Sequence, residues 1–247
     1  KNRQALLNMN IKLVPQDGSG ITADTETVYV SAALDENNPD IKAARALNIP
    51  VKQRSDLLAE VFHGYPFGIA VGGTSGKTTT TAMIGYIFDM LGQKPCLVNG
   101  GMLRNYEQLK GLPNFIYNEG RFCIIEADES DGSICKYHPQ IALVNNISHD
   151  HTSMENLIGY FQTFADNTKG TLVVNGDCEL TRNLKHDRKT TFSVKDPAAD
   201  FFADGIKCLP DGVEYNFRGQ TFHLNLFGAF NVSNALAAIA VCAETGL

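Results

Sequence analysis

A glycine-rich segment between an apolar run and a helical pattern constrains this chain more than any other feature. Residues 69–81 read Ile-Ala-Val-Gly-Gly-Thr-Ser-Gly-Lys-Thr-Thr-Thr-Thr, and apolar residues then recur at helical spacing over residues 83–91. This order predicts a strand, a loop and a helix, which is the context that a phosphate-binding loop requires. Backbone N–H groups of such a loop converge on phosphate oxygens, and the helix N-terminus adds partial positive charge.

Two side chains carry the chemistry expected of this loop. Lys77 supplies a positive charge for the β- and γ-phosphates of a nucleotide, and the Thr78 hydroxyl is a ligand for Mg²⁺. Val71 stands where the strict pattern G-x-x-x-x-G-K-[ST] has its first glycine, so the motif is the variant G-T-x-G-K-T. The alternative is a glycine-rich turn with an exposed lysine. The agreement of loop, lysine, threonine and helix favours phosphate binding.

Composition and charge narrow the functional classes. Of 247 residues, 43% are hydrophobic and 19% are charged, which suits a globular protein with a sizeable core. The net charge of −6 argues against a nucleic-acid-binding surface as the main function. No apolar run is long enough to cross a bilayer, so we expect no membrane partner. The six cysteines form no C-x-x-C pair, and we interpret them as reduced core residues of a cytoplasmic protein.

Strand-like and helix-like segments alternate along the chain, which predicts an α/β protein with helices on the faces of a parallel sheet. We expect residues 1–66 to be the remainder of a Rossmann-like domain without its opening glycine turn, and residues 67–247 to be a P-loop ATPase domain. Strands are predicted at residues 11–14, 27–31, 68–71, 95–98, 122–126, 141–145 and 171–175. Beyond Thr190, short alternating segments that begin with residues 191–194 predict a small antiparallel hairpin region.

The buried strand at residues 122–126 ends in a carboxylate, Glu126. In a phosphate-loop ATPase, a second strand of this kind presents an acid to the metal at the carboxyl edge of the sheet, so Glu126 is a candidate Mg²⁺ ligand. Asp128, Glu129 and Asp131 follow closely, and carboxylates this crowded repel one another unless cations or donors are present. The alternative is a solvated acidic loop.

Polar residues also follow the next buried strand, at residues 145–151, and should face the same edge. His149 and His151 form a His-x-His pair, but no further ligands appear at a spacing usable for structural zinc. One histidine beside a Mg²⁺–phosphate site fits better, and a structural hydrogen-bonding role is the alternative for either. Further along, Asn231 is predicted to be the N-cap of the last helix, with Asn234 on the same side.

Together these motifs resemble the Mur ligase family of peptidoglycan synthesis. The matching segments are residues 73–79, 99–101 and 126–131, Asn146-Ile147 with Asp150-His151, and Asn231 with Asn234. The Glu-Ala-Asp-Glu-Ser-Asp form is similar to the branch that joins L-alanine or a peptide to UDP-N-acetylmuramate. Residues 31–33 with Asn38-Pro39 resemble the UDP-sugar domain of that branch. The resemblance covers nearly the whole chain.

The resemblance implies a UDP-sugar domain, a central ATPase and a C-terminal domain that brings the amino acid. We expect the last to be absent, so the chain looks like a fragment whose activity by itself is open. The implied reaction is ATP-driven amide formation: the γ-phosphoryl group passes to a substrate carboxylate, and an amine displaces phosphate from the resulting acyl phosphate. ATP and Mg²⁺ are the implied cofactors, with UDP-N-acetylmuramate and an amino acid or peptide as partners.

The resemblance also assigns roles to individual residues. The implied catalytic groups are Lys77, Glu126 and His151. The implied metal ligands are Thr78, Glu126 and His151. The implied nucleotide site is Gly73, Thr74, Ser75, Gly76, Lys77, Thr78, Thr79, Asn231 and Asn234. The implied sugar-substrate site is Ser31, Asn99, Gly100, Gly101, Asp128, Glu129 and Ser130.

Three positions depart from the family pattern. Ser75 replaces a histidine, Ala229-Phe230 replaces Arg-His, and no aspartate follows Asp150-His151 in residues 152–154. L-alanine is therefore the first candidate amine, with a murein-peptide ligase or another paralogue as the alternative. A non-catalytic nucleotide-binding module is a further alternative. A P-loop GTPase or kinase ranks last, because no Asn-Lys-x-Asp pattern is present. The sequence does not define the oligomeric state.

Overall fold

The computed structural model describes residues 2–106, 112, 114–149 and 153–247. The first 66 residues contain α1 (Asn2–Asn8), β1 (Val28–Val30), α2 (Pro39–Ala46), β2 (Val51–Gln53) and α3 (Arg54–His63). Next come β3 (Phe67–Gly72), α4 (Lys77–Met90), β4 (Cys96–Val98), η1 (Arg104–Tyr106), β5 (Phe115–Ile116), β6 (Phe122–Glu126), η2 (Ser133–Lys136) and β7 (Ile141–Val144). The remainder contains α5 (Met154–Asp166), β8 (Thr171–Asn175), α6 (Glu179–Arg182), β9 (Lys189–Ser193), β10 (Phe201–Leu209), β11 (Gly212–Phe217), β12 (Gln220–Leu224) and α7 (Phe230–Glu244).

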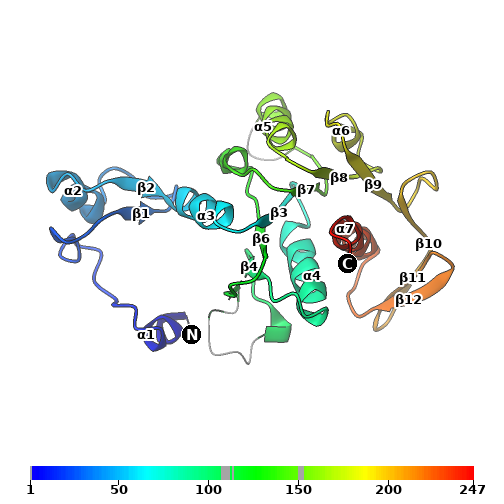
Figure 1. The fold of residues 1–247 in the computed structure, drawn as a ribbon, viewed down its shortest axis with the longest axis horizontal. Coiled ribbons are helices and arrows are strands. Elements are labelled where there is room, and N and C mark those ends of the chain that lie inside the picture. Colours follow the sequence, from blue (N-terminus) through cyan, green and yellow to red (C-terminus); the bar gives the residue numbers. More distant parts are fainter. Residues whose placement is uncertain (1, 107–111, 113, 150–152) are drawn as a thin grey trace.

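A ten-stranded sheet, in the order β12-β11-β10-β9-β8-β7-β3-β6-β4-β5, dominates the molecule (Figure 1). Within this order, the strands from β10 through β9, β8, β7, β3 and β6 to β4 are all parallel to their neighbours. At one edge β5 is antiparallel to β4, and at the other β11 is antiparallel to both β10 and β12. The predicted α/β class, parallel sheet and small antiparallel region are therefore confirmed. A separate parallel pair, β1 with β2, precedes this sheet in the chain.

Two local predictions were wrong. Residues 11–14 form no strand, because their short apolar run has no neighbouring strand to pair with. Residues 191–193 belong to β9, which is parallel to both β8 and β10 rather than part of the antiparallel hairpin region. Alternation of apolar and polar residues defines the two faces of a strand but not its direction, so the pattern carried no signal for this.

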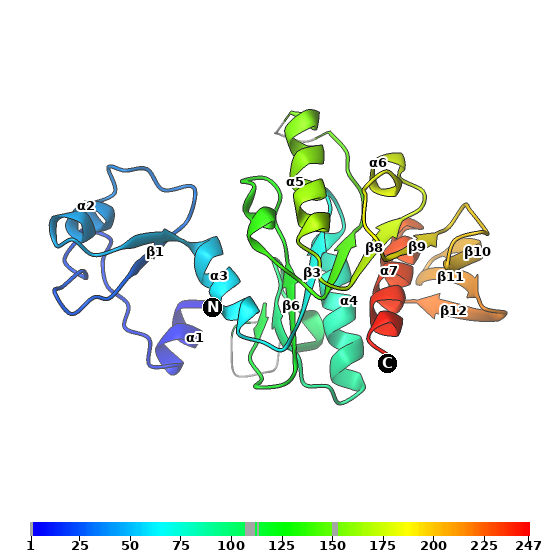
Figure 2. The same cartoon turned by 45° about the horizontal axis from the view of Figure 1, so that its top comes forward.

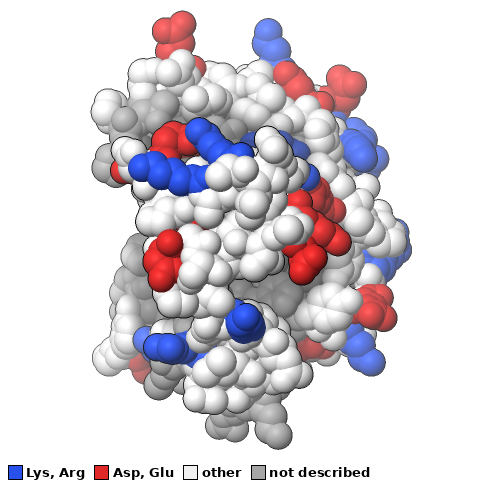
Figure 3. All heavy atoms as spheres, turned by 90° about the vertical axis from the view of Figure 1, so that its left-hand side faces the viewer, with Lys and Arg blue, Asp and Glu red and all other residues white. Residues whose placement is uncertain are grey.

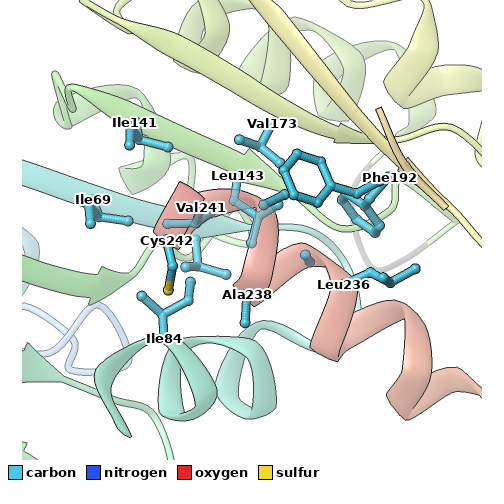
Figure 4. Packing of buried hydrophobic residues seen from close by; sticks show 14 of the residues in the cluster. Ile69, Ile84, Ile141, Leu143, Val173, Phe192, Leu236, Ala238, Val241 and Cys242 are labelled. Atoms are coloured by element: carbon cyan, nitrogen blue, oxygen red, sulfur yellow. The ribbon is translucent and has the colours of Figure 1, made fainter. Parts of the chain in front are cut away.

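Both faces of the sheet are covered by helices, and this is why β3 reads as a continuous apolar run. α4 and α7 cover one face, where Ile69 meets Ile84 and Val241 in a single core (Figure 4). α5, η2 and the end of α3 cover the other face, which holds Ala70 and Phe164 (Figure 2). The sheet is thereby held rigidly from both sides, and its carboxyl edge is a fixed platform.

α3 connects the first 66 residues to this platform. Its Phe62 ring lies directly over Gly68 of β3, where a Cβ atom would overlap the ring. Lys136 of η2 donates to Asp56 at 2.6 Å and to Ser55 at 2.9 Å. Seen from the side of α2, β1 and β2, acidic and basic side chains are interspersed with uncharged ones (Figure 3). Among the described residues, no helix is long and apolar enough to cross a membrane.

Candidate functional site

The order of the strands creates a crevice at the carboxyl edge of the sheet. β3 lies between β6 and β7, and the chain leaves β3 through α4 for β4 before returning to β6. Connections that diverge in this way leave a crevice outside the strand ends, where ligands of α/β proteins bind. The segments after β3, β4, β6 and β7 all meet here, and they carry most of the residues that the sequence singled out.

The loop after β3 has a backbone that only glycine allows. Gly73 and Gly76 have φ values of 131° and 83°. A Cβ atom on Gly76 would lie 2.7 Å from Asn234 Oδ1 and 3.0 Å from Asn145 Nδ2. α4 begins at Lys77 without a side-chain cap, so N–H groups of its first turn remain for a ligand. A loop and a helix N-terminus of this form attract anions.

Asn146 holds the loop against β7. Its Oδ1 accepts hydrogen bonds from Thr74 Oγ1 at 2.7 Å and from Ser75 N at 2.9 Å, and its Nδ2 donates to Ser75 O at 3.0 Å. Thr74 N donates to Asn146 O at 3.0 Å, and Ser148 N donates to Thr74 Oγ1 at 3.1 Å. The loop therefore has a fixed shape before any ligand arrives.

Lys77 is held at the centre of the crevice. Its Nζ donates to Gly73 O at 2.8 Å and to the two carboxylate oxygens of Glu129 at 2.9 and 3.1 Å. Only 2% of the Glu129 side chain and 14% of the Lys77 side chain are exposed. Burial raises the pKa of Glu129, and the Lys77 charge opposes that rise. A buried carboxylate thus holds the ammonium group in place.

Thr78 and Glu126 bring two oxygen ligands together. Thr78 Oγ1 donates to Glu126 Oε1 at 3.0 Å, and Gly100 N donates to Glu126 Oε2 at 2.8 Å. A Cβ atom on Gly100 would lie 2.5 Å from Glu126 Oε2, so a side chain there would displace the end of the Glu126 side chain. Carboxylate and hydroxyl oxygens are the ligands that Mg²⁺ prefers.

A chain of polar side chains runs beneath the loop from β7 to α7. Asn145 Nδ2 donates to Thr80 Oγ1 at 3.0 Å, Thr80 Oγ1 donates to Asn234 Oδ1 at 3.3 Å, and Asn234 Nδ2 donates to Asn231 Oδ1 at 3.0 Å. Asn231 Nδ2 in turn donates to Phe227 O at 2.9 Å. The predicted N-cap role of Asn231 was wrong: α7 begins at Phe230, and Asn231 is buried inside its first turn.

A small cavity of about 100 Å³ lies between α3 and the same edge. Its lining residues are Arg54, Ser55, Leu58, Val98, Asn99, Gly100, Glu126, Asp128, Ser133 and Tyr137. Burial raises the pKa of Tyr137 to about 12, so the phenol stays protonated at neutral pH. Asn99 Nδ2 donates to Gly101 O at 3.1 Å, which shapes the turn after β4. Larger surface hollows beside η1 and along β10 and β11 lie away from this edge.

The remaining sequence-predicted residues are placed as follows. Thr79 lies half-buried in the first turn of α4, and Ser130 N donates to Asp128 Oδ1 at 3.0 Å in the loop after β6. Ser31 is exposed just after β1, and its Oγ accepts from Ala33 N at 3.4 Å. In the part of the chain that the structure describes, no hydrogen bond links Ser31 to the crevice. His151 lies outside the described residues.

Sequence reasoning missed several residues of the site. Asn145 and Asn146 were placed at this edge by the sequence, as polar residues after an apolar strand, but their hydrogen bonds to the loop and to Thr80 were not predicted. Arg54 and Tyr137 carried no local signal, because they reach the crevice only through the docking of α3 and the turn after η2.

Comparisons with known proteins agree with this geometry. Residues 71–242 match the model of the Mur ligase middle domain, and residues 1–66 match the model of the Mur ligase family, catalytic domain. A UDP-N-acetylmuramate–L-alanine ligase of Thermosynechococcus vestitus is 37% identical over 231 residues, which cover 89% of this chain and 47% of that protein. One of Maricaulis maris is 34% identical over 250 residues, covering 94% and 51%.

Solved structures show the same architecture. The UDP-N-acetylmuramate–alanine ligase of Thermotoga maritima superimposes with a TM-score of 0.86 at 26% identity, covering 99% of this chain and 57% of that chain. A UDP-N-acetylmuramate:L-alanyl-γ-D-glutamyl-meso-diaminopimelate ligase of Neisseria meningitides shares the fold, with a TM-score of 0.82 at 22% identity. The chain spans about half the length of the curated relatives it matches. With its middle-domain match extending over most of its length, this chain belongs to the Mur ligase family.

Proposed function

We propose that this chain supplies the ATP-binding part of an ATP-dependent carboxylate–amine ligase of peptidoglycan precursor synthesis, which joins L-alanine to UDP-N-acetylmuramate. The observation that carries the proposal is the convergence of a glycine loop, Lys77 and the Thr78–Glu126 pair in one crevice. The names of the relatives, at 34–37% identity, support the choice of both substrates.

The residues present fit Mg²⁺ and the phosphates of ATP. Thr78 Oγ1 and Glu126 Oε1, already 3.0 Å apart, would hold the metal, and His151 is proposed as a further ligand on the strength of the motif alone. When bound, Mg²⁺ neutralises charge on the phosphate oxygens. The loop from Gly73 to Thr79 would bind the phosphates. Asn231 and Asn234 support this loop from beneath, and we propose that the nucleotide lies over the start of α7.

Lys77 would exchange partners when the nucleotide binds. Its ammonium group is held by Glu129 and Gly73 O, and the β- and γ-phosphate oxygens are stronger charged acceptors for the same hydrogens. Until the nucleotide binds, Glu129 and Gly73 O hold the ammonium group beside the loop. Because the exchange takes place on binding, the ammonium group is already on the phosphates when charge develops, and little reorganisation is needed in the transition state.

We propose that the acceptor carboxylate lies in the small cavity between α3 and the sheet edge. Glu126 lines that cavity and also contacts Thr78, so the acceptor would lie beside the proposed metal site. Arg54, at the start of α3, is the cation of the cavity, and it offers a planar pair of donors for a carboxylate. Of the proposed sugar-side residues, Asn99, Gly100 and Asp128 line this cavity, and Gly101, Glu129 and Ser130 are their neighbours along the chain. Ser31 would contact the nucleotide part of the sugar substrate.

We further propose two domains, residues 1–66 for the UDP-sugar and residues 67–247 for ATP, in a cytoplasmic protein. The two separate sheets and the two family matches support this division. The described cysteines, all free thiols, are compatible with a reducing compartment.

An amine panel tests the proposed function. Full-length protein is incubated with ATP, Mg²⁺, UDP-N-acetylmuramate and a series of amino acids and peptides, and both ADP and the amide product are measured. We expect ADP release to depend on L-alanine above all other amines. Preference for a peptide would favour the murein-peptide ligase instead. ADP release without an amide product, or no turnover with any amine, would favour a nucleotide-binding module.

Two variants connect that assay to the crevice. Replacement of Lys77 by glutamine should lower turnover about 10²- to 10³-fold, as for other preorganised charge contacts to a transition state. Lys207→Gln, at an exposed position on β10, is the matched control and should leave turnover unchanged. Equal activity of the two variants would contradict the assignment of Lys77.

A further inference from the structure

A second polar cavity lies at the opposite edge of the ten-stranded sheet, where the strands begin. It has a volume of about 260 Å³. Its lining residues are Phe62, His63, Tyr65, Gly68, His138, Gln140 and Lys169. They come from the end of α3, the start of β3 and the turns that lead into β7 and β8. Nothing in the proposed ligase reaction uses this edge, since the phosphate loop follows the other end of β3.

The backbone of this edge is already hydrogen-bonded. Gly68 N donates to Gln140 Oε1 at 2.6 Å, Gln140 N donates to Gly68 O at 2.9 Å, and Lys169 N donates to Pro139 O at 2.8 Å. The bond from Gly68 N holds the Gln140 side-chain amide in place through its oxygen. Within the described part of the chain, the Nε2 group of Gln140 has no acceptor, so it is left as a donor for the cavity.

The two histidines add further donors. His138 N donates to His63 Nε2 at 3.1 Å, so neutral His63 carries its proton on Nδ1. The two rings lie 5.4 Å apart. Burial lowers the pKa of His63, and the nearby His138 and Lys169 lower it further. The Tyr65 hydroxyl, which also lines the cavity, donates to Asn118 O at 2.8 Å.

One cation, Lys169, lines the cavity without a compensating carboxylate. No Asp or Glu lines the cavity, and across residues 2–106, 114–149 and 153–247 no ion pair involves Lys169. The Lys169 ammonium group, the Nδ1 group of neutral His63 and the free side of Gln140 are all donors. A site that combines several donors, one cation and no acid is complementary to an anion with several acceptor oxygens.

We propose that this cavity binds a small oxyanion of the phosphate class, between Lys169, Gln140 and the His63–His138 pair. The volume accommodates a phosphate group with part of an attached ester. Free phosphate and a phosphate monoester share this chemistry, and the relative affinities of the two distinguish them. The site is separate from the phosphate loop, and the proposal holds whether or not the ligase function does.

Imidazole proton resonances of the 247-residue chain test the proposal. Sodium phosphate is titrated at constant ionic strength, with sodium chloride as the compensating salt, and glycerol phosphate is the second probe. We expect saturable shifts of the His63 and His138 resonances, and a rise of the His63 pKa when phosphate is bound. The His186 and His223 resonances, which lie outside the cavity, should not shift. Tighter binding of glycerol phosphate would identify an ester as the ligand, and tighter binding of phosphate would identify the free ion.

Variants distinguish this site from others. Lys169→Gln should weaken phosphate binding about tenfold or more, because a charge-assisted contact is lost, whereas Lys207→Gln should have no effect. In Lys77→Gln, the shifts of His63 and His138 should persist, which excludes a signal transmitted from the phosphate loop. No saturable shift, the same shift with chloride alone, or an unchanged affinity in Lys169→Gln would overturn the proposal.

Discussion

The two sheets of this molecule differ in how they are stabilised. In β3 every residue from Gly68 to Gly72 is buried, because helices cover both faces of the ten-stranded sheet. In the two-stranded sheet only Val30 is buried, and β2 has no buried residue. A pair of strands with so little buried apolar surface is marginally stable by itself. The first 66 residues therefore depend on α3, whose end is packed into the core of the larger sheet.

This difference bears on function. The loop after β3 follows a strand whose last five residues are all buried, so its shape is fixed by the core. The proposed sugar-binding part is attached through one helix and the Lys136–Asp56 contact. The proposed reaction needs precise positioning where phosphate charge is neutralised, and the loop proposed for that role is held by the core.

The largest expected effect tests the connection through α3. Phe62→Ala should lower the free energy of unfolding by about 3–5 kcal/mol, since a fully buried aromatic ring is lost from beneath β3. Val30→Ala, in the two-stranded sheet, removes two methylene equivalents and should cost about 1–2 kcal/mol. Urea unfolding followed by circular dichroism measures both. Equal losses would contradict the claim that α3 is anchored mainly in the larger sheet.

The next effect concerns nucleotide binding. Lys77→Gln should weaken Mg·ATP binding about 100-fold, which corresponds to about 2.7 kcal/mol, because a charged contact to the phosphates is lost. Isothermal titration calorimetry measures the affinity. Lys52→Gln, in the two-stranded sheet, serves as the control and should bind Mg·ATP normally. If Lys52→Gln weakens binding as much as Lys77→Gln, the two regions are not functionally distinct as described.

A smaller effect separates backbone strain from crowding at Gly76. Gly76→Ala places a side chain at a positive φ and against Asn234, and should cost about 1–3 kcal/mol of stability. Gly219→Ala has a similar φ of 77° but no atom within 4 Å of the new Cβ, so it isolates the strain. Gly76→Ala should be the more destabilising of the two in thermal unfolding. The reverse order would mean that the polar contacts beneath the loop are loose.

The smallest effect is a pH dependence. Because the folded chain raises the pKa of Glu129 above its ordinary 4.5, the folded state holds this proton to higher pH than the unfolded state. The contribution of Glu129 to stability therefore falls as pH rises from about 4.5 through the raised pKa. The free energy of unfolding of the wild type minus that of Glu129→Gln, measured in urea across that window, should decrease with rising pH. An increase would mean that the Lys77 charge outweighs burial in setting the Glu129 pKa.

Local sequence patterns predicted the platform well. The strands at residues 122–126 and 171–175 have the predicted bounds, because buried parallel strands are short apolar runs with clear ends. The strand, loop and helix around Lys77 were also predictable, since the glycines, the lysine and the following helical pattern are contiguous. The direction of β9 was not, because the choice of pairing partner depends on the whole sheet.

The interior of the site could not be predicted in the same way. Asn231 was expected to cap α7, but the helix begins one residue earlier and buries this side chain in the chain of contacts that reaches Asn145. Arg54 and Tyr137 meet at the crevice from α3 and from the turn after η2. Contacts between residues so distant in the sequence arise from tertiary packing, about which the local pattern carries no information.

A crystal structure of the chain with Mg²⁺ and a non-hydrolysable ATP analogue is the most direct test of the central claim. We predict that the β- and γ-phosphates lie on the loop from Gly73 to Thr78, with Lys77 Nζ turned from Glu129 to the phosphate oxygens and the metal on Thr78 and Glu126. A nucleotide bound elsewhere, or phosphates on the loop with Lys77 still paired with Glu129, would contradict this account.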